Sequence, residues 1–251
     1  MPRHLFHNSQ FSIQQNMALI LCIETGTDIC SVALARDGEM IALRESDLGH
    51  EHARKVAVFT QELLREHDIA PDELDAVAVG KGPGSYTGLR IGVSFAKGLC
   101  YALGIPLLAI DSLRSLAACL VEEHEAGIVD IEDWDNTLLC PMIDARRMEV
   151  YAELFDTNLN PLSEVVAEVV TDTSFGEVLL QRKRLVIFGN GAEKCSNVLE
   201  WAQYVNVAPS ARGLCTEAER KFVADEREDV AYFEPFYLKD FIVKTSKKKL
   251  F

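Results

Sequence analysis

Residues 19–43 read LILCIETGTDICSVALARDGEMIAL, and their three apolar runs indicate how the fold begins. Its first apolar run, Leu19 to Glu24, ends in an acid, and a second run, Cys30 to Ala35, follows the polar residues 25–28. A turn at 36–38 then leads into a third run, Glu39 to Leu43. Continuous apolar runs of this length are typical of strands covered on both faces. The stretch therefore predicts three consecutive strands joined by short turns.

Helices and strands alternate after these three strands. Apolar residues recur at helical spacing from Glu51 to His67 and again up to Leu103, and short apolar runs are typical of buried strands. The predicted order is a helix at 51–67, a strand at 76–79, a glycine-rich turn, a helix ending at Leu103, a strand at 106–110 and a helix capped by Asp111-Ser112.

The same order of elements begins again at Thr137. A run from Leu138 to Ile143 ends in Asp144, as the first run ends in Glu24. This run is followed by two predicted strands at 149–155 and 164–170, a helix at 175–181 and a strand at 185–188. The repeated β-β-β-α-β-α order predicts an α/β fold of two RNase H-like lobes, the construction of actin, heat-shock chaperone ATPases and sugar kinases. We expect a disordered leader at 1–16, a first lobe with association helices at 17–126, and a second lobe at 127–251 whose last helix can return to the first.

Composition limits the classes of function. The 251 residues carry 39 acidic and 25 basic side chains, a net charge of -14, which repels phosphate backbones. We therefore do not expect this chain by itself to bind tRNA or DNA directly, so any contact with tRNA would be indirect. Seven cysteines without a C-x-x-C pair indicate reduced, buried thiols in a cytoplasmic protein. No apolar run approaches the ~20 residues that cross a bilayer, so no membrane is expected.

The glycine-rich stretch 80–90 reads GKGPGSYTGLR. It is not a Walker A loop, because no Lys-Ser or Lys-Thr follows the glycines. Small residues recur every fourth position at Gly84, Gly88, Gly92 and Ala96. From about Thr87 onward this gives one helix face a stripe that another backbone can approach closely. Phosphate binding at the helix N-terminus is the alternative reading. We favour close contact with another helix.

Both helices beside this stretch carry surplus apolar surface. Val58 and Phe59 lie off the main core stripe of the 51–67 helix, and the helix that ends at Leu103 is apolar almost all round. Both could be interior helices, but such surplus also suits an association face. The predicted partner interface contains Val58, Phe59, Gly84, Gly88, Arg90, Gly92, Phe95, Ala96 and Leu99.

Candidate chemistry elsewhere is sparse. Glu24 with 25–27 could form a hairpin around nucleotide phosphates or a metal, or a plain polar turn. His50 and His52 lie two residues apart and lack further ligands, so we expect capping or solvent-facing side chains. Ser112 has no G-x-S-x-G setting and is expected to be an N-cap. No catalytic constellation remains.

Several segments together resemble a known family. They are Ile23-Glu24-Thr25, Cys30-Ser31-Val32-Ala33, the glycine-rich run 80–92, Ala96-Lys97-Gly98-Leu99, the segment 144–151 and Pro235-Phe236-Tyr237-Leu238. The chain resembles TsaB, formerly YeaZ, the bacterial subunit needed for threonylcarbamoyladenosine (t6A) formation on tRNA. The likeness covers nearly everything after Met17 and is looser in the second half.

The resemblance implies a two-lobed actin-like ATPase fold. It also implies pairing with the paralogous catalytic subunit TsaD through the first two helices of each partner, with the ATPase TsaE joining and a homodimer forming when the chain is alone. No cofactor is required, although ATP or ADP is a candidate ligand at the subunit junction. A vestigial nucleotide site would use Glu24, Thr25, Gly26, Thr27 and Asp144.

The resemblance also bears on catalysis. The catalytic relative binds a metal through an H-x-x-x-H segment, and Ser112 and Leu116 stand where its two histidines would be. Since leucine cannot ligate a metal, the chain is expected to hold no metal and to act as a non-catalytic scaffold for TsaD. The alternatives are a stand-alone actin-fold ATPase or kinase that uses Glu24, Thr27 and Asp144, and a metallopeptidase.

Overall fold

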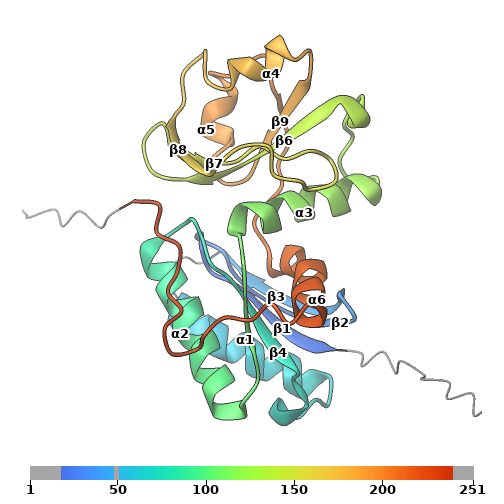
Figure 1. Ribbon diagram of the computed structural model, residues 1–251, viewed down its shortest axis with the longest axis vertical. Helices are drawn as coiled ribbons and strands as arrows, with labels where there is room; N and C mark the ends of the chain where they lie inside the picture. Colours follow the sequence, from blue (N-terminus) through green and yellow to red (C-terminus); the bar gives the residue numbers. More distant parts are fainter. Residues whose placement is uncertain (1–17, 48–50, 240–251) are drawn as a thin grey trace, which may run out of the picture.

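Two five-stranded sheets, each flanked by helices, are stacked along the long axis of the molecule (Figure 1). The structure is a computed structural model that describes residues 18–47 and 51–239. The expected leader at 1–16 and His50 lie outside these ranges. No helix in the described ranges is both long and apolar enough to cross a membrane.

The first sheet contains the strands predicted from residues 19–43 at its centre and at one edge. Its strands are β1 (Leu19–Glu24), β2 (Cys30–Arg36), β3 (Glu39–Ser46), β4 (Ala76–Gly80) and β5 (Leu107–Ile110), in the order β3-β2-β1-β4-β5. Strand β1 is antiparallel to β2 and parallel to β4. Every residue of β1 is buried, because helices cover both faces of the sheet.

Alternate residues of β1 face two different cores. Helices α1 (His52–Glu66) and α2 (Tyr86–Leu103) pack on the face that includes Leu21 and Ile23. The opposite face, which includes Ile20 and Cys22, is covered by a 3-10 turn (Ala211–Leu214) and by α6 (Cys215–Val223). Helix α6 thus comes from the far end of the chain and packs on the first sheet.

The second sheet repeats the topology of the first. Its strands are β6 (Thr137–Asp144), β7 (Glu149–Ala152), β8 (Val166–Val169), β9 (Arg184–Phe188) and β10 (Gln203–Tyr204). The order β10-β9-β6-β7-β8, read backwards, matches the order of the first sheet. The pairings match as well, since β6 is antiparallel to β7 and parallel to β9. The predicted two-lobed actin-like α/β fold is confirmed.

Helix α3 (Ser112–Glu125) lies between the two sheets (Figure 1). Its Leu116 and Leu120 belong to the same hydrophobic cluster as Val186 and Phe188 of β9. The short helices α4 (Gly176–Leu180) and α5 (Glu193–Ser196) cover the other face of the second sheet. An element from the first half of the sequence therefore packs on the second sheet.

Two strands of the second half are shorter than the sequence predicted. Strand β7 ends at Ala152 instead of Phe155, and β8 spans only 166–169 of the predicted 164–170. Phe155 instead exchanges backbone hydrogen bonds with Leu139 at 2.9 Å in each direction. A turn follows at once, in which the Asp156 carboxylate accepts hydrogen bonds from the backbone N–H groups of Asn158 and Asn160. Beyond β7 and β8 the hairpin is irregular, with Leu162 N donating to Leu154 O at 2.7 Å and an isolated bridge between Phe155 and Pro161.

Candidate functional site

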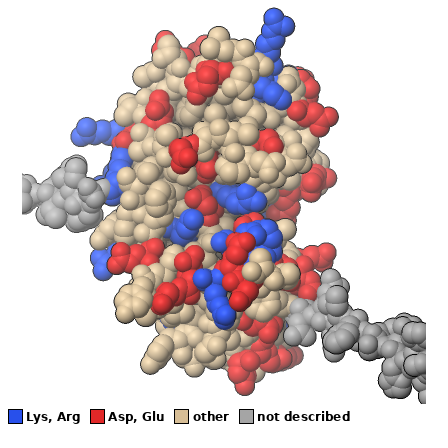
Figure 2. Space-filling view, in the orientation of Figure 1, with Lys and Arg blue, Asp and Glu red and all other residues tan. Residues whose placement is uncertain are grey.

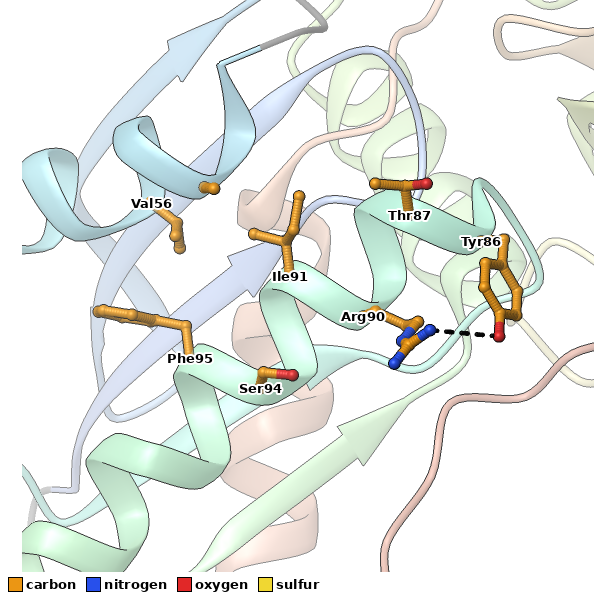
Figure 3. A pocket seen from close by; sticks show the side chains of 8 residues that line it. Val56, Tyr86, Thr87, Arg90, Ile91, Ser94 and Phe95 are labelled. Carbon is orange, nitrogen blue, oxygen red and sulfur yellow. Dashed lines mark hydrogen bonds between the residues drawn. The ribbon is translucent and has the colours of Figure 1, made fainter.

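A groove of about 460 Å³ lies between α1 and α2 on the outside of the first lobe (Figure 3). Val56 of α1 points towards Ile91 and Phe95 of α2, which form the apolar part of the groove. The remaining lining residues are Ala53, Tyr86, Thr87, Arg90 and Ser94. The groove therefore joins an apolar floor to a rim of hydroxyl groups and one guanidinium group.

The ends of α2 are well defined by local sequence. The Ser85 hydroxyl accepts a hydrogen bond from Gly88 N at 3.3 Å and caps the N-terminus. Gly104 closes the C-terminus in the left-handed conformation, with φ of 71°. At the N-terminal end, Arg90 lies 5.4 Å from the Tyr86 ring centre and donates a long hydrogen bond, 3.4 Å, to its hydroxyl. These contacts hold two polar lining residues together.

The predicted interface residues divide into two sets. Arg90 and Phe95 line the groove, and Val58 is exposed on α1. Phe59 is buried in the core, and Leu99 is partly buried against that core. Sequence reasoning missed the other lining residues, because it assigned the face to the glycines. The apolar residues Ile91 and Phe95 beside the polar Arg90 and Ser94 were the available signal.

The small-residue stripe faces inward, so its assignment to a partner interface was wrong. Gly88, Gly92 and Ala96 are buried, and a Cβ atom on Gly84, Gly88 or Gly92 would lie closer than 3.0 Å to atoms of Thr25 or Gly26. The backbone that approaches the stripe is the turn after β1 of the same chain. Close contact was predicted correctly, but its partner is a turn within the lobe and not another helix.

The turn at residues 24–27 is enclosed by this packing. The Thr25 hydroxyl donates to Gly88 O at 2.9 Å, and Ser85 N donates to Gly26 O at 2.6 Å. Thr27 is buried, and its carbonyl oxygen lies 2.9 Å from His52 Nε2. His52 is itself buried, which corrects the expectation of a capping or solvent-facing side chain. The Thr25 hydroxyl and Ser85 N, two donors that could otherwise bind a phosphate, are thus engaged within the lobe.

Glu24 lies at the centre of a buried hydrogen-bond network. Its Oε1 accepts from Gly26 N at 2.7 Å, and its Oε2 accepts from the Ser112 hydroxyl at 2.9 Å. Ser112 Oγ in turn accepts from Gly82 N at 3.2 Å. Burial raises the pKa of Glu24, and the hydrogen bonds from Gly26 and Ser112 oppose that shift. The carboxylate therefore joins β1, the glycine-rich loop and α3.

The cap of α3 comes from Asp111 and not from Ser112. The Asp111 carboxylate accepts from Leu113 N at 2.9 Å and from Arg114 N at 3.2 Å. Burial raises the pKa of Asp111, and the Arg114 backbone N–H acts against that change. Leu116 is fully buried in the cluster between α3 and the second sheet. Of the two positions that correspond to metal-binding histidines in the catalytic relative, Ser112 thus hydrogen-bonds to Glu24, and Leu116 belongs to the hydrophobic core.

Asp144 lies apart from the Glu24 network. It ends β6 in the second lobe and is exposed, and its Oδ1 pairs with Lys194 and accepts from Arg146 N at 3.1 Å. Asn190 Oδ1 accepts from Asp144 N at 3.1 Å. The structure records no direct bond between Asp144 and residues 24–27 within the described ranges. Those ranges also contain no cluster of three or more His, Cys, Asp or Glu side chains suited to a metal ion.

Charged side chains gather in a band between the lobes (Figure 2). Arg212 pairs with Glu122 and Glu123 of α3, and Arg114 lies 3.4 Å from Glu217 of α6. Arg114 also donates to Leu159 O in the second lobe at 2.6 Å. Arg114 thus links α3 and α6 to the second lobe, and both arginines are paired with carboxylates.

The C-terminal segment 226–239, here called the strap, also contacts the glycine-rich loop. Phe236 N donates to Lys81 O at 2.7 Å, and the Tyr237 ring lies 4.7 Å from the ring of Tyr86. Its residues 235–238 carry part of the family resemblance, but the sequence alone gave no reason to place them beside residues 80–90.

Comparison with known proteins agrees with this architecture. A family model described as TsaD, tRNA N6-adenosine threonylcarbamoyltransferase, matches residues 46–233. The tRNA threonylcarbamoyladenosine biosynthesis protein TsaB of Bacillus subtilis is 33% identical over 228 residues, which cover 88% of this chain and 93% of that protein. The tRNA N6-adenosine threonylcarbamoyltransferase of Nitratidesulfovibrio vulgaris is 37% identical over 122 residues, 42% of this chain and 34% of that protein.

A solved structure shows the same fold. YeaZ from Pseudomonas aeruginosa superposes with a TM-score of 0.74 at 25% identity, and the match covers 88% of this chain and 100% of that chain. The likeness to the Bacillus protein spans nearly the full length of both chains, whereas the likeness to the transferase is confined to a part of each. The chain therefore belongs to the TsaB family.

Proposed function

We propose that this chain is a non-catalytic subunit that binds a TsaD-type threonylcarbamoyltransferase through the groove between α1 and α2. Its relatives are named for threonylcarbamoyladenosine biosynthesis, and the transferase related to it in sequence is named for transfer onto adenosine of tRNA. The observation that carries the proposal is the groove itself, with Val56, Ile91 and Phe95 beneath an accessible rim.

The chemistry of the groove suits a helix of a partner protein. Apolar side chains from the partner would bury Ile91 and Phe95, and a carboxylate or carbonyl oxygen would pair with Arg90. Arg and Tyr residues at such positions contribute strongly to binding, because each combines a large contact area with directed hydrogen bonds. The same face on a second copy of the chain would form a symmetric homodimer when the transferase is absent.

Side chains inside the first lobe support a non-catalytic role for this chain. Ser112 is engaged with Glu24, and Leu116 is in the core, so neither supplies a metal ligand for the transfer reaction. A net charge of -14 favours contact with tRNA through the partner. We propose that the chain needs no cofactor of its own and that ATP or ADP binds at the subunit junction. We also propose that a TsaE-type ATPase joins the assembly and that this assembly works in the cytoplasm.

A bulky substitution in the groove tests the proposal. Ser94 is exposed on α2, so Ser94→Trp fills the groove and leaves the core of the first lobe unchanged. Overpacking at a contact costs about 1–3 kcal/mol, which is roughly 5- to 150-fold in affinity. Leu180→Trp adds a similar ring at a side chain that is 86% exposed in the second lobe, and serves as the matched control.

The measurements are the mass of the mixture with the transferase by light scattering, the dissociation constant by calorimetry, and t6A formation. Wild type and Leu180→Trp should form the complex and support modification, and Ser94→Trp should bind about 5- to 150-fold more weakly and support less modification at limiting concentration. Normal complex formation by Ser94→Trp would refute the groove as the binding site. Threonylcarbamoyl transfer by the chain alone would refute the non-catalytic role.

A further inference from the structure

The strap runs back along α2 towards the N-terminal end of that helix (Figure 1, red). It begins beside β5, where Glu228 N donates to Leu107 O at 2.9 Å. Val230 and Phe233 then pack against the core between the first sheet and the helices. These contacts keep the strap on the outside of α2.

Lys97 of α2 fastens the middle of the strap. Its ammonium group donates to Phe233 O at 2.8 Å and to Ala231 O at 3.2 Å. Both acceptors are backbone carbonyl groups, so the contact depends on the path of the strap and not on its side chains. A charged donor to two carbonyl oxygens is stronger than a neutral hydrogen bond.

The strap reaches the groove at Tyr237. After Phe236 N binds Lys81 O, the Tyr237 ring lies 4.7 Å from the Tyr86 ring with an angle of 36° between the planes. Tyr86 lines the groove, and Arg90, also a lining residue, lies over its ring. Tyr237 therefore contacts Tyr86, which in turn contacts Arg90, and of these three residues Tyr237 lies outside the groove lining.

We propose that Tyr237 and Lys97 are positioning residues for partner binding: the strap holds the Tyr86 ring, and through it Arg90, in the orientation that the partner meets. This inference rests on the proposed role of the groove. An aromatic ring on a helix surface has several rotamers, and a second ring packed against it removes the alternatives before binding. Preorganisation of this kind raises affinity without adding a contact to the partner.

A double-mutant cycle in the full chain tests this mechanism against the TsaD-type partner. Calorimetry gives the dissociation constant for Tyr237→Ala, Tyr86→Ala and the double variant. Tyr237→Ala should weaken binding about 3- to 10-fold, the range for an aromatic pair. Because Tyr237 acts through Tyr86, the same change in the Tyr86→Ala background should have no further effect.

Conservative and control variants complete the design. Tyr237→Phe keeps the ring and should bind within about twofold of wild type. Tyr232→Ala removes a tyrosine of the same strap whose side chain is 85% exposed, and should bind normally. Lys97→Met keeps the aliphatic stem but loses both hydrogen bonds and should resemble Tyr237→Ala, and Lys97→Arg should restore binding. Circular dichroism at the assay temperature checks that each variant is folded.

The outcomes separate the two proposals. If Ser94→Trp weakens binding and Tyr237→Ala binds as wild type does, the positioning role is wrong and the groove assignment stands. If Tyr237→Ala weakens binding equally with and without Tyr86, Tyr237 contacts the partner directly, and positioning through Tyr86 is wrong. If Ser94→Trp binds normally, the groove assignment fails and the inference about the strap fails with it.

Discussion

Two alanine substitutions on α2 should change the stability of the isolated chain in opposite directions. Gly88 and Gly98 both lie inside the helix, so alanine improves helix propensity at either position by about 1 kcal/mol. A Cβ atom at Gly98 would meet nothing within 4 Å. At Gly88 it would lie closer than 3.0 Å to the carbonyl oxygen of Thr25, a backbone atom that cannot rotate away.

The cost at Gly88 has two parts. Moving the turn after β1 to admit a methyl group is an overpacking change, which costs about 1–3 kcal/mol. The movement also breaks the hydrogen bond from the Thr25 hydroxyl to Gly88 O, and a buried unsatisfied polar group costs about 1–3 kcal/mol. After the gain in propensity, Gly88→Ala should destabilise the chain by about 1–5 kcal/mol and Gly98→Ala should stabilise it by about 1 kcal/mol.

Urea and thermal unfolding of the isolated chain at one fixed protein concentration measure the difference. For a chain of this size each kcal/mol moves the midpoint by about 2–4 °C. The midpoint of Gly98→Ala should rise and that of Gly88→Ala should fall, without any partner present. If Gly88→Ala is at least as stable as wild type, the stripe is not packed against the turn, and its assignment to a partner surface becomes tenable again.

Two further changes probe the Glu24 network inside the first lobe and the separate carboxyl group of Glu153. Ser112→Ala removes the hydroxyl that donates to Glu24 and accepts from Gly82 N. The free energy of unfolding should fall by about 1–3 kcal/mol for each buried group left without a partner. Unfolding in urea at the wild-type midpoint would show that these hydrogen bonds do not stabilise the fold. Burial and the nearby charge of Asp111 raise the pKa of Glu153 from 4.5 to about 7. The folded chain therefore binds a proton on Glu153 more tightly than the unfolded chain does, and its stability should fall as the pH rises from 4.5 to about 7. Glu153→Gln should flatten this fall in a series of melting curves, and an unchanged slope would show that another group titrates.

Much of the fold is contained in local sequence. The apolar runs from Leu19 to Glu24 and from Leu138 to Ile143 predict central strands, because short runs that are apolar at nearly every position and end in turns are typical of strands covered on both faces. Their repetition predicted two sheets of one topology, and the sheet orders agree. The absence of histidine at positions 112 and 116 is likewise a property of the sequence, since composition alone decides which ligands exist there.

The direction in which each surface faces required the tertiary structure. Helical periodicity shows that Gly88, Gly92 and Ala96 share one face of α2. The periodicity is the same whether that face meets a partner or the turn after β1. The groove, the strap beside Tyr86 and the packing of α3 on the second sheet depend on segments far apart in the chain. Local sequence determines which residues lie together on an element, and long-range packing decides which of those faces remain open to solvent.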